Sequence, residues 1–201
     1  MEFCHGYVTN ESTREQEKVD IKQLKKTCQE SIMTREECYK EYERVGILYG
    51  ESHKGILGLY KGNGKALAEL QLADQDEGYC LHPGMLDSAI QSAIGVLNDG
   101  SGTCELMLPY GIGQCTIYQG TSKHMWAAVI PSEEQKTEEG IKKVHIHLYT
   151  DQGILAVRIQ NMSFRTAQKR GKSQTKRDAT LTFYPVWERK NIEWKKGGTR
   201  K

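Results

Sequence analysis

The longest run of weakly polar sequence, HPGMLDSAIQSAIGVL at residues 82–97, predicts a helix. Pro83 suits the first helical turn, with His82 just before it. The sequence NDG at 98–100 ends the helix near Leu97. Apolar residues lie on every side of this helix, so its surroundings must bury it almost completely. We therefore expect it at the centre of the domain.

Apolar runs on both sides of this helix predict antiparallel hairpins. Residues 55–72 are interrupted by GNG at 62–64, and residues 144–165 by DQG at 151–153, and both triplets are strong turn signals. Apolar and polar positions alternate from residue 144, which is the period of a half-buried strand. Two further segments have strand-like composition, 108–119 and 124–131. An α+β architecture, with an antiparallel sheet wrapped around a long central helix, accounts for this order.

The first quarter of the chain predicts a strand and two helices. Residues 2–9 are typical of a short strand, and residues 20–32 have a weak helical pattern. A stronger helix is expected over 34–45, because TREE at 34–37 matches a capping box and Gly46 follows as a stop. The apolar stripe of this second helix consists of Cys38, Tyr39, Tyr42 and Val45.

Composition indicates one large domain with a polar tail. Of the 201 residues, 37% are hydrophobic, which is low and suggests a core diluted by polar segments. The net charge of +2 gives no case for a nucleic-acid or membrane-binding protein, and no apolar run is long enough to span a membrane. Residues 166–178 are basic and without periodicity, typical of a linker, and LTFYPVWE at 181–188 looks like the start of another region. The N-terminus lacks the pattern of a signal peptide.

The cysteines favour a reducing compartment. The six of them form no CxxC pair, and the four-ligand spacing of a zinc site is absent. We therefore expect reduced, mostly buried thiols in a cytoplasmic protein with no bound metal.

Four motifs resemble those of the C-terminal half of a polyketide synthase dehydratase domain and follow one another along the chain in the family's order. The central one, HPGMLDSAIQ at 82–91, is similar to the family pattern H-P-x-x-L-D-x-x-x-Q/H. The others are GILYGESHKGI at 46–56, LPYGIGQCTIY at 108–118 and VHIHLYTDQGILAVRIQNMSFR at 144–165. The likeness covers roughly residues 1–166. Within the family, the sequence most resembles bacterial modular synthases with separate acyltransferases.

The resemblance implies the second half of a double hotdog fold. Residues 1–166 would form its C-terminal lobe, with 1–10 as the last strand of, or linker from, the first lobe. Residues 167–201 would be a basic linker and the start of the region after the dehydratase. The chain would be one piece of a much longer multienzyme.

Two departures from the family pattern stand out. None of the six histidines fits the motif H-x-x-x-G-x-x-x-x-P that carries the family's catalytic histidine. In addition, Glu51 and His53 stand where the family usually has Pro and Phe. The resemblance therefore implies that the catalytic base lies on a missing N-terminal lobe.

Asp87 and Gln91 are the candidate catalytic residues. Loss of water from a β-hydroxyacyl thioester needs a base for the α-proton and an acid for the departing hydroxyl. A carboxyl group in apolar surroundings has a raised pKa and can serve as that acid. Asp87 has apolar sequence neighbours, and Gln91 follows one helical turn later on the same face, where it can orient the carboxyl. By resemblance, Asp87 is the acid and Gln91 its orienting partner.

Other interpretations of these residues stay open. Asp87 could be a buried residue satisfied by a backbone amide. Ser88 and Gln91 also fit a capping box, in which case the helix starts near Asp87 and leaves the carboxylate in water. His82 is expected as a helix cap or loop anchor. The resemblance places Tyr49, Gly50, His82 and Pro83 beside the substrate channel.

The resemblance also implies the partners. The substrate would be carried on the phosphopantetheine of an acyl carrier protein, with no other cofactor. The N-terminal lobe and neighbouring synthase domains would contact the chain, and the parent enzyme would be a homodimer. A basic cluster in the linker, Lys169, Arg170, Lys172, Lys176 and Arg177, could meet an acidic carrier protein or simply be solvated.

Three rival functions share this fold. The first is a dehydratase-like enoyl isomerase or pyran-forming cyclase. The isomerases tend to lose the Asp and the cyclases tend to replace the Gln, whereas this chain has both residues. A non-catalytic lobe would serve as scaffold and dimer contact. A hotdog thioesterase would hydrolyse the thioester. In the leading interpretation the isolated chain is inactive, because the base is missing.

Overall fold

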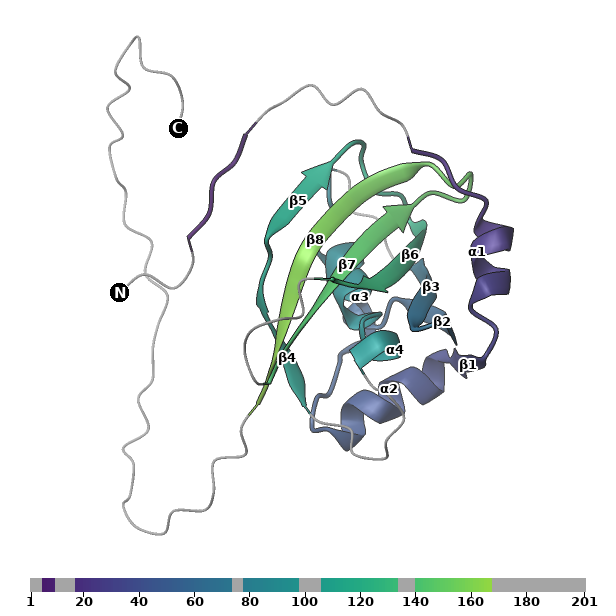
Figure 1. Cartoon of the computed structure of the whole chain (residues 1–201), viewed down its shortest axis with the longest axis vertical. Helices are drawn as coiled ribbons and strands as arrows, with labels where there is room; N and C mark the ends of the chain where they lie inside the picture. Colours follow the sequence, from purple (N-terminus) through teal and green to yellow (C-terminus); the bar gives the residue numbers. More distant parts are fainter. Residues whose placement is uncertain (1–4, 10–16, 74–77, 98–105, 134–139, 168–201) are drawn as a thin grey trace. The chain divides into compact units, whose positions relative to one another are not determined.

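The chain divides into two compact units, Thr13–Gln168 and a second made of Met1–Ser12 with Lys169–Lys201. A computed structural model (Figure 1) describes residues 5–9, 17–73, 78–97, 106–133 and 140–167. Residues 5–9 carry no regular secondary structure, so the strand expected over 2–9 is not formed there. A strand forms by pairing with a neighbouring strand, and the strand order of the described sheet does not include residues 5–9.

One antiparallel sheet forms the body of the larger unit. Its strands follow the order β1-β2-β3-β6-β7-β8-β4, and β5 also pairs with β8. The strands are β1 Ser31–Thr34, β2 Ile56–Gly62, β3 Lys65–Gln71, β4 Met107–Gly111, β5 Gln114–Ile117, β6 His124–Pro131, β7 Ile141–Tyr149 and β8 Leu155–Thr166. Figure 1 shows the sheet curving around the central helices, the arrangement expected from the sequence.

Both predicted hairpins are confirmed. Asn63 and Gly64 link β2 to β3 with φ angles of 52° and 68°, as a type I′ turn requires. The second hairpin joins β7 to β8. The segment predicted over 108–119 is split into β4 and β5, which both pair with β8. Gly113 lies in the gap, where a Cβ would stand 2.9 Å from the Cβ of Asn161.

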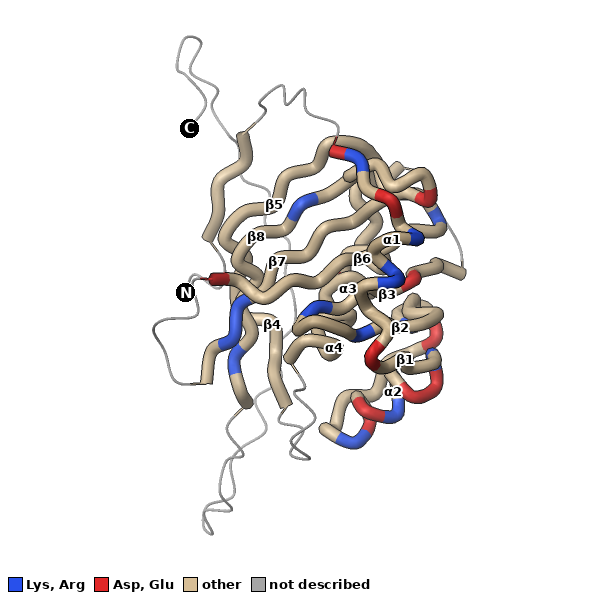
Figure 2. The backbone as a smooth tube through the Cα atoms, turned by 45° about the vertical axis from the view of Figure 1, so that its right-hand side comes forward, with Lys and Arg blue, Asp and Glu red and all other residues tan. Residues whose placement is uncertain are grey.

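Helices pack on both faces of the sheet. They are α1 Ile21–Thr27, α2 Arg35–Arg44, the short 3₁₀ helix η1 Glu51–His53, α3 Pro83–Gln91 and α4 Ile94–Leu97. The capping box of α2 is confirmed, with the Glu37 N–H 3.3 Å from Thr34 Oγ1 and the Thr34 N–H 2.8 Å from Glu37 Oε2. Gly46 follows this helix at φ 95°. Figure 2 shows both acidic and basic residues along α2, so the helix carries charges of both signs.

The weak helix predicted over 20–32 is shorter than expected. Asp20 caps α1 by accepting from the Lys22 N–H at 2.8 Å, but the helix ends at Thr27. Residues Ser31–Thr34 instead pair with β2 as an edge strand. Backbone pairing with a neighbouring strand thus overrides a weak local pattern.

The single helix expected over 82–97 is broken into α3 and α4. Ser88 Oγ donates to the Gly84 carbonyl at 2.8 Å, and Ser92 Oγ donates to the Ser88 carbonyl at 2.9 Å. Serine hydroxyls bonded to carbonyls one turn back commonly bend helices. Gly95 then brings α4 against the sheet, since a Cβ there would lie 2.7 Å from the Ala66 Cβ.

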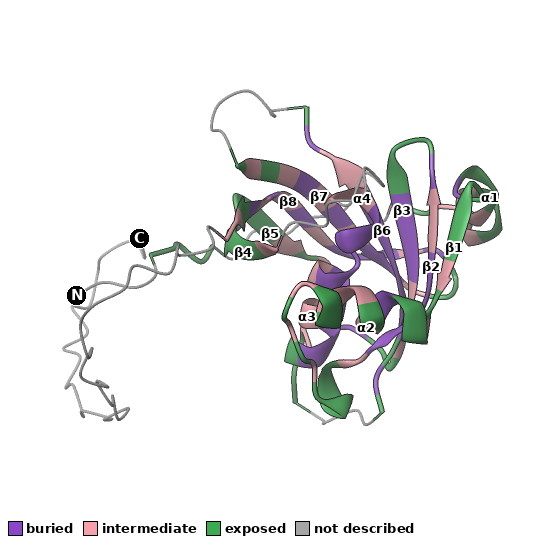
Figure 3. Cartoon of the chain, turned by 90° about the horizontal axis from the view of Figure 1, so that it is seen from below, coloured by how far each residue is buried: buried purple, intermediate pink, exposed green. Residues whose placement is uncertain are grey.

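The sheet has two apolar faces (Figure 3). The inner face packs against α2, α3 and α4 and includes Ile56, Leu59, Met125 and Ile159, all fully buried. The outer face is smaller and is covered by α1 and the segment before it. The buried cluster on this side consists of Cys28, at the end of α1, and the sheet residues Leu67, Trp126, Ala128, Tyr149 and Leu155. Among the described residues, no helix is long and apolar enough to cross a membrane.

The expectation of mostly buried thiols holds for half of the described cysteines. Cys28 and Cys38 are buried, whereas Cys80 and Cys115 are exposed. Cys4 and Cys104 lie outside the described residues. Burial, with a smaller contribution from the charge of Glu37, raises the pKa of Cys38 to about 12.

This difference in pKa and exposure predicts the order of thiol labelling. In a variant with Ser at positions 4 and 104, we expect a thiol reagent to modify Cys80 first. Cys115 should follow more slowly, because burial raises its pKa as well. Cys38 should react only after denaturant is added, since the reactive species is the thiolate. Peptide mass spectrometry reads out each site, and rapid labelling of Cys38 in the native protein would contradict the burial described here.

Candidate active site

Helix α3 presents the candidate site on its side facing α2. His82 caps this helix, because its Nδ1 accepts from the Gly84 N–H at 3.1 Å. Its own N–H donates to Thr121 Oγ1 at 3.1 Å, which anchors the preceding loop. The cap role expected for His82 is thus confirmed. The alternative in which the helix starts near Asp87 is wrong, since α3 begins at Pro83.

Asp87 and Gln91 are paired as expected from their spacing. Gln91 Nε2 donates to Asp87 Oδ2 at 2.9 Å and also to the His53 carbonyl oxygen at 2.9 Å. Gln91 is 2% exposed, so its amide is held entirely by protein groups. Asp87 is only half-buried, together with Leu86 and Ile90, so the near-complete enclosure expected for this helix is not met by the described residues.

Three tyrosines form a layer over this pair. Tyr39 and Tyr42 come from α2, and Tyr49 comes from the segment that follows it. The Tyr49 ring stands edge-on to the other two, with centroids 6.0 Å from Tyr39 and 5.0 Å from Tyr42. The Tyr39 hydroxyl lies 3.0 Å from Gln91 Oε1, and the Tyr42 hydroxyl donates to the Gln91 carbonyl oxygen at 2.5 Å.

The tyrosines are kept neutral. Burial raises the pKa of Tyr39 and of Tyr42 well above the usual value. Burial, followed by the charge of Asp87, raises the pKa of Tyr49 to about 12. All three phenols therefore keep their hydrogens near neutral pH, and those of Tyr39 and Tyr42 face acceptors on Gln91.

The loop that contains η1 supplies backbone groups to the site. The His53 carbonyl faces Gln91, and the Ile56 N–H donates to the Tyr39 hydroxyl at 3.0 Å. Gly55 lets this loop approach α3, because a Cβ there would lie 2.2 Å from Ser88 Oγ. The loop is thus fixed against the helix by a residue without a side chain.

Glu51 and His53, which stand where the family usually has Pro and Phe, both have exposed side chains. Glu51 is exposed and forms ion pairs with Lys54 at 2.6 Å and Arg35 at 3.2 Å. The hydrogen bond and charge of Lys54 lower the pKa of Glu51. The His53 ring is exposed and lies beside Ser52, and only its carbonyl oxygen contacts Gln91. The site therefore depends on the backbone at position 53 rather than on its side chain.

The structure brings only some of the predicted site residues close together. Asp87 and Gln91 are hydrogen-bonded, and Tyr49 packs against the two tyrosines that contact Gln91. Gly50 is exposed, and a Cβ added there would meet nothing within 4 Å. His82 and Pro83 lie at the start of α3, one turn before Asp87. Their placement beside a substrate channel stays a prediction.

Sequence reasoning missed the hydroxyls of Tyr39 and Tyr42, which it assigned to an apolar stripe. Two tyrosines three residues apart on a buried helix face were the available signal, because a buried hydroxyl usually finds a hydrogen-bond partner. The His53 carbonyl carried no sequence signal at all. Within the described ranges, no group of three His, Cys, Asp or Glu residues could hold a metal ion.

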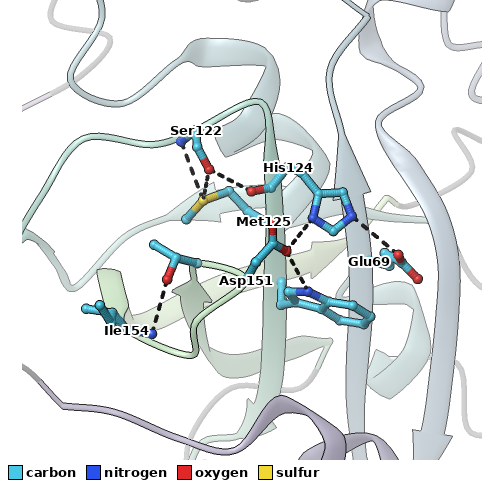
Figure 4. Close-up of polar contacts among 8 residues, drawn as sticks. Glu69, Ser122, His124, Met125, Asp151 and Ile154 are labelled. Atoms are coloured by element: carbon cyan, nitrogen blue, oxygen red, sulfur yellow. Dashed lines mark hydrogen bonds and ion pairs between the residues drawn. The ribbon is translucent and has the colours of Figure 1, made fainter.

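A second polar cluster lies on the outer face of the sheet (Figure 4). His124 Nδ1 is 2.6 Å from Asp151 Oδ1, and its Nε2 is 3.3 Å from Glu69 Oε1. Trp126 Nε1 donates to the same Asp151 oxygen at 3.2 Å. The cluster links β3, β6 and the turn after β7. Side-chain alternation along β6 places it on the sheet face opposite Met125, away from α3.

Comparison with known proteins agrees with this fold. The family model described as "Polyketide synthase dehydratase N-terminal domain" matches residues 16–174. The chain therefore belongs to the polyketide synthase dehydratase family. Because that description names an N-terminal domain, the match leaves the assignment to a C-terminal lobe as a prediction.

Individual relatives are large synthases or domains cut from them. The chain is 31% identical over 182 residues to Polyketide synthase PksL of Bacillus subtilis, covering 87% of this chain and 4% of PksL. A trans-AT dehydratase domain from Brevibacillus brevis is similar in structure, with a TM-score of 0.71 and 29% identity. That alignment covers 78% of this chain and 56% of that domain. The dehydratase domain from the CurK module of curacin synthase gives a TM-score of 0.68 at 29% identity, covering 80% of this chain and 56% of that domain.

The chain thus spans about half the length of the dehydratase domains it matches and a few per cent of PksL. It has the hotdog fold of a polyketide synthase dehydratase.

Proposed function

We propose that this chain is the lobe of a polyketide synthase dehydratase that supplies the acid, Asp87, for loss of water from a β-hydroxyacyl thioester. The observation that carries the proposal is the hydrogen bond from Gln91 Nε2 to Asp87 Oδ2. It leaves the other oxygen of the carboxyl available to a substrate. Membership in the dehydratase family and the motif at 82–91 support the same role.

In the proposed reaction, a base removes the α-proton of the acyl chain, and the electron pair of that C–H bond forms the new C=C bond. The β C–O bond breaks as Asp87 gives its proton to the departing hydroxyl, which leaves as water. Asp87 ends as a carboxylate that Gln91 stabilises, and proton exchange with solvent resets both groups. The base would be a histidine outside this chain, because none of its six histidines fits the family motif.

The proposed partners follow from placing the acid on this chain and the base outside it. The remaining hotdog lobe would supply the base and cover the half-buried side of α3 around Asp87. The substrate would arrive on the phosphopantetheine of an acyl carrier protein, and the parent synthase would be a cytoplasmic homodimer. Four exposed apolar side chains on and beside β4 and β5 are consistent with such a covering surface, namely Leu108, Tyr110, Ile112 and Ile117.

Comparing two lengths of the protein tests the proposal. One is the chain itself, and the other is the chain preceded by the contiguous upstream part of its synthase. With a 3-hydroxyacyl group on a carrier protein, we expect the longer form to release water and the chain alone to leave the substrate unchanged. Intact-protein mass spectrometry measures the loss of one water.

Each other outcome contradicts a stated part of the proposal. Dehydration by the chain alone would place the base within it. Thioester hydrolysis would favour a thioesterase, and a migrated double bond or a new ring would favour an isomerase or cyclase. An inactive longer form would favour a scaffold.

A further inference from the structure

The Tyr39 hydroxyl connects the loop backbone to the amide of Gln91. Its oxygen accepts from the Ile56 N–H at 3.0 Å and lies 3.0 Å from Gln91 Oε1. A phenol has one hydrogen, and the Ile56 N–H has no hydrogen-bonding role except as a donor. The single hydrogen of Tyr39 is therefore available to Gln91 Oε1.

Two groups together determine which way the Gln91 amide points. The His53 carbonyl can only accept, so the NH₂ end of the amide must face it. If the amide were flipped, Oε1 would face the His53 oxygen, and Nε2 would face a phenol oxygen that already accepts from Ile56. Both contacts favour the observed orientation, in which the second hydrogen of Nε2 points at Asp87 Oδ2.

We propose that Tyr39 is a positioning residue, which fixes the Gln91 amide so that it donates to Asp87 and never accepts from it. The consequence concerns the proton of a neutral Asp87. Because Oδ2 receives a hydrogen from Gln91, that proton must reside on Oδ1. Tyr39 thereby selects the oxygen that delivers the proton, and this last step rests on the function proposed above.

Tyr42 provides a matched comparison on the same helix. It is three residues from Tyr39, packs against the same Tyr49 ring and also donates to Gln91. Its acceptor is the backbone oxygen of Gln91, however, and not the side-chain amide. Replacing either tyrosine with Phe removes one hydroxyl from the same region, but only Tyr39→Phe releases the amide.

Side-chain amide NMR tests the positioning role in the chain itself, without any substrate. In the unmodified chain we expect the two Gln91 Nε2 hydrogens to exchange slowly with solvent. Tyr39→Phe should speed this exchange about threefold to tenfold, as expected for the loss of one hydrogen bond. Tyr42→Phe should leave it within about twofold. Equal exchange in both variants would overturn the proposal.

Kinetics of the longer, two-lobe form test the catalytic consequence. Tyr39→Phe should lower kcat by about tenfold to a hundredfold with little change in KM, since the acid is misplaced and the substrate still binds. An unchanged kcat in Tyr39→Phe, or an equal loss of kcat in Tyr42→Phe, would contradict the inference.

The two measurements separate the possible failures. If the unmodified two-lobe form does not dehydrate its substrate, the proposed function is wrong, and the NMR comparison still decides the role of Tyr39. If it does dehydrate the substrate and the two Phe variants behave alike in both assays, Tyr39 has no positioning role.

Discussion

Asp87→Asn in the two-lobe dehydratase is expected to lower the rate of dehydration by about 10²- to 10⁴-fold, the usual contribution of a positioned acid. The amide has nearly the same shape as the carboxyl and can still accept from Gln91 Nε2, so the helix and the tyrosine layer should persist. It has no acidic proton to give to the departing hydroxyl. Steady-state formation of the enoyl product measures the effect, and circular dichroism checks the fold.

Asp20→Asn is the matched control for this substitution. Asp20 caps α1 on the outer face of the sheet, and Asn caps a helix about as well as Asp does. We expect this variant to keep the original rate. Turnover by Asp87→Asn within a few-fold of the Asp20→Asn rate would show that Asp87 is not the acid.

Gly55→Ala is expected to destabilise the fold strongly. Its new Cβ would lie 2.2 Å from Ser88 Oγ and 2.9 Å from Ser88 Cβ, and Ser88 is fully buried in α3. Relief requires the loop to move away from the helix, which also carries the His53 carbonyl away from Gln91. Overpacking of this kind costs about 1–3 kcal/mol, and we expect the upper part of that range in the free energy of unfolding.

Gly50→Ala controls for the change of residue type in the same loop. A Cβ at Gly50 would meet nothing within 4 Å, and its φ of −74° suits any residue. We expect its free energy of unfolding to change by no more than about 0.5 kcal/mol. Urea unfolding of the chain compares the two variants, and equal stabilities would mean that the loop and α3 are not in close contact.

Local patterns in the sequence predicted most of the sheet and the start of each main helix. The turn at Asn63 and Gly64 and the capping box at Thr34 are short-range features whose geometry depends on neighbouring residues alone. The pairing of Asp87 with Gln91 followed for the same reason, since one helical turn separates them. These features need no knowledge of the rest of the fold.

Contacts between distant segments could not be predicted in the same way. The short edge strand at Ser31 depends on pairing with β2, and the break after Gln91 depends on how two serine hydroxyls choose their acceptors. The tyrosine layer brings α2 within hydrogen-bond distance of a residue 52 positions later in the chain. Each of these outcomes is decided by tertiary packing, which a hydrophobic pattern describes only as burial.

The Gln91 amide donates to two acceptors, and this affects whether histidine could replace glutamine at position 91. The family pattern allows Gln or His at this position, yet here one nitrogen supplies hydrogens to two acceptors at once. A neutral imidazole has a single N–H, so a histidine could serve Asp87 or the His53 carbonyl but not both. In this chain the two residue types are therefore not interchangeable. A switch to histidine would need a compensating rearrangement of the loop at 51–55, so the loop and position 91 should vary together.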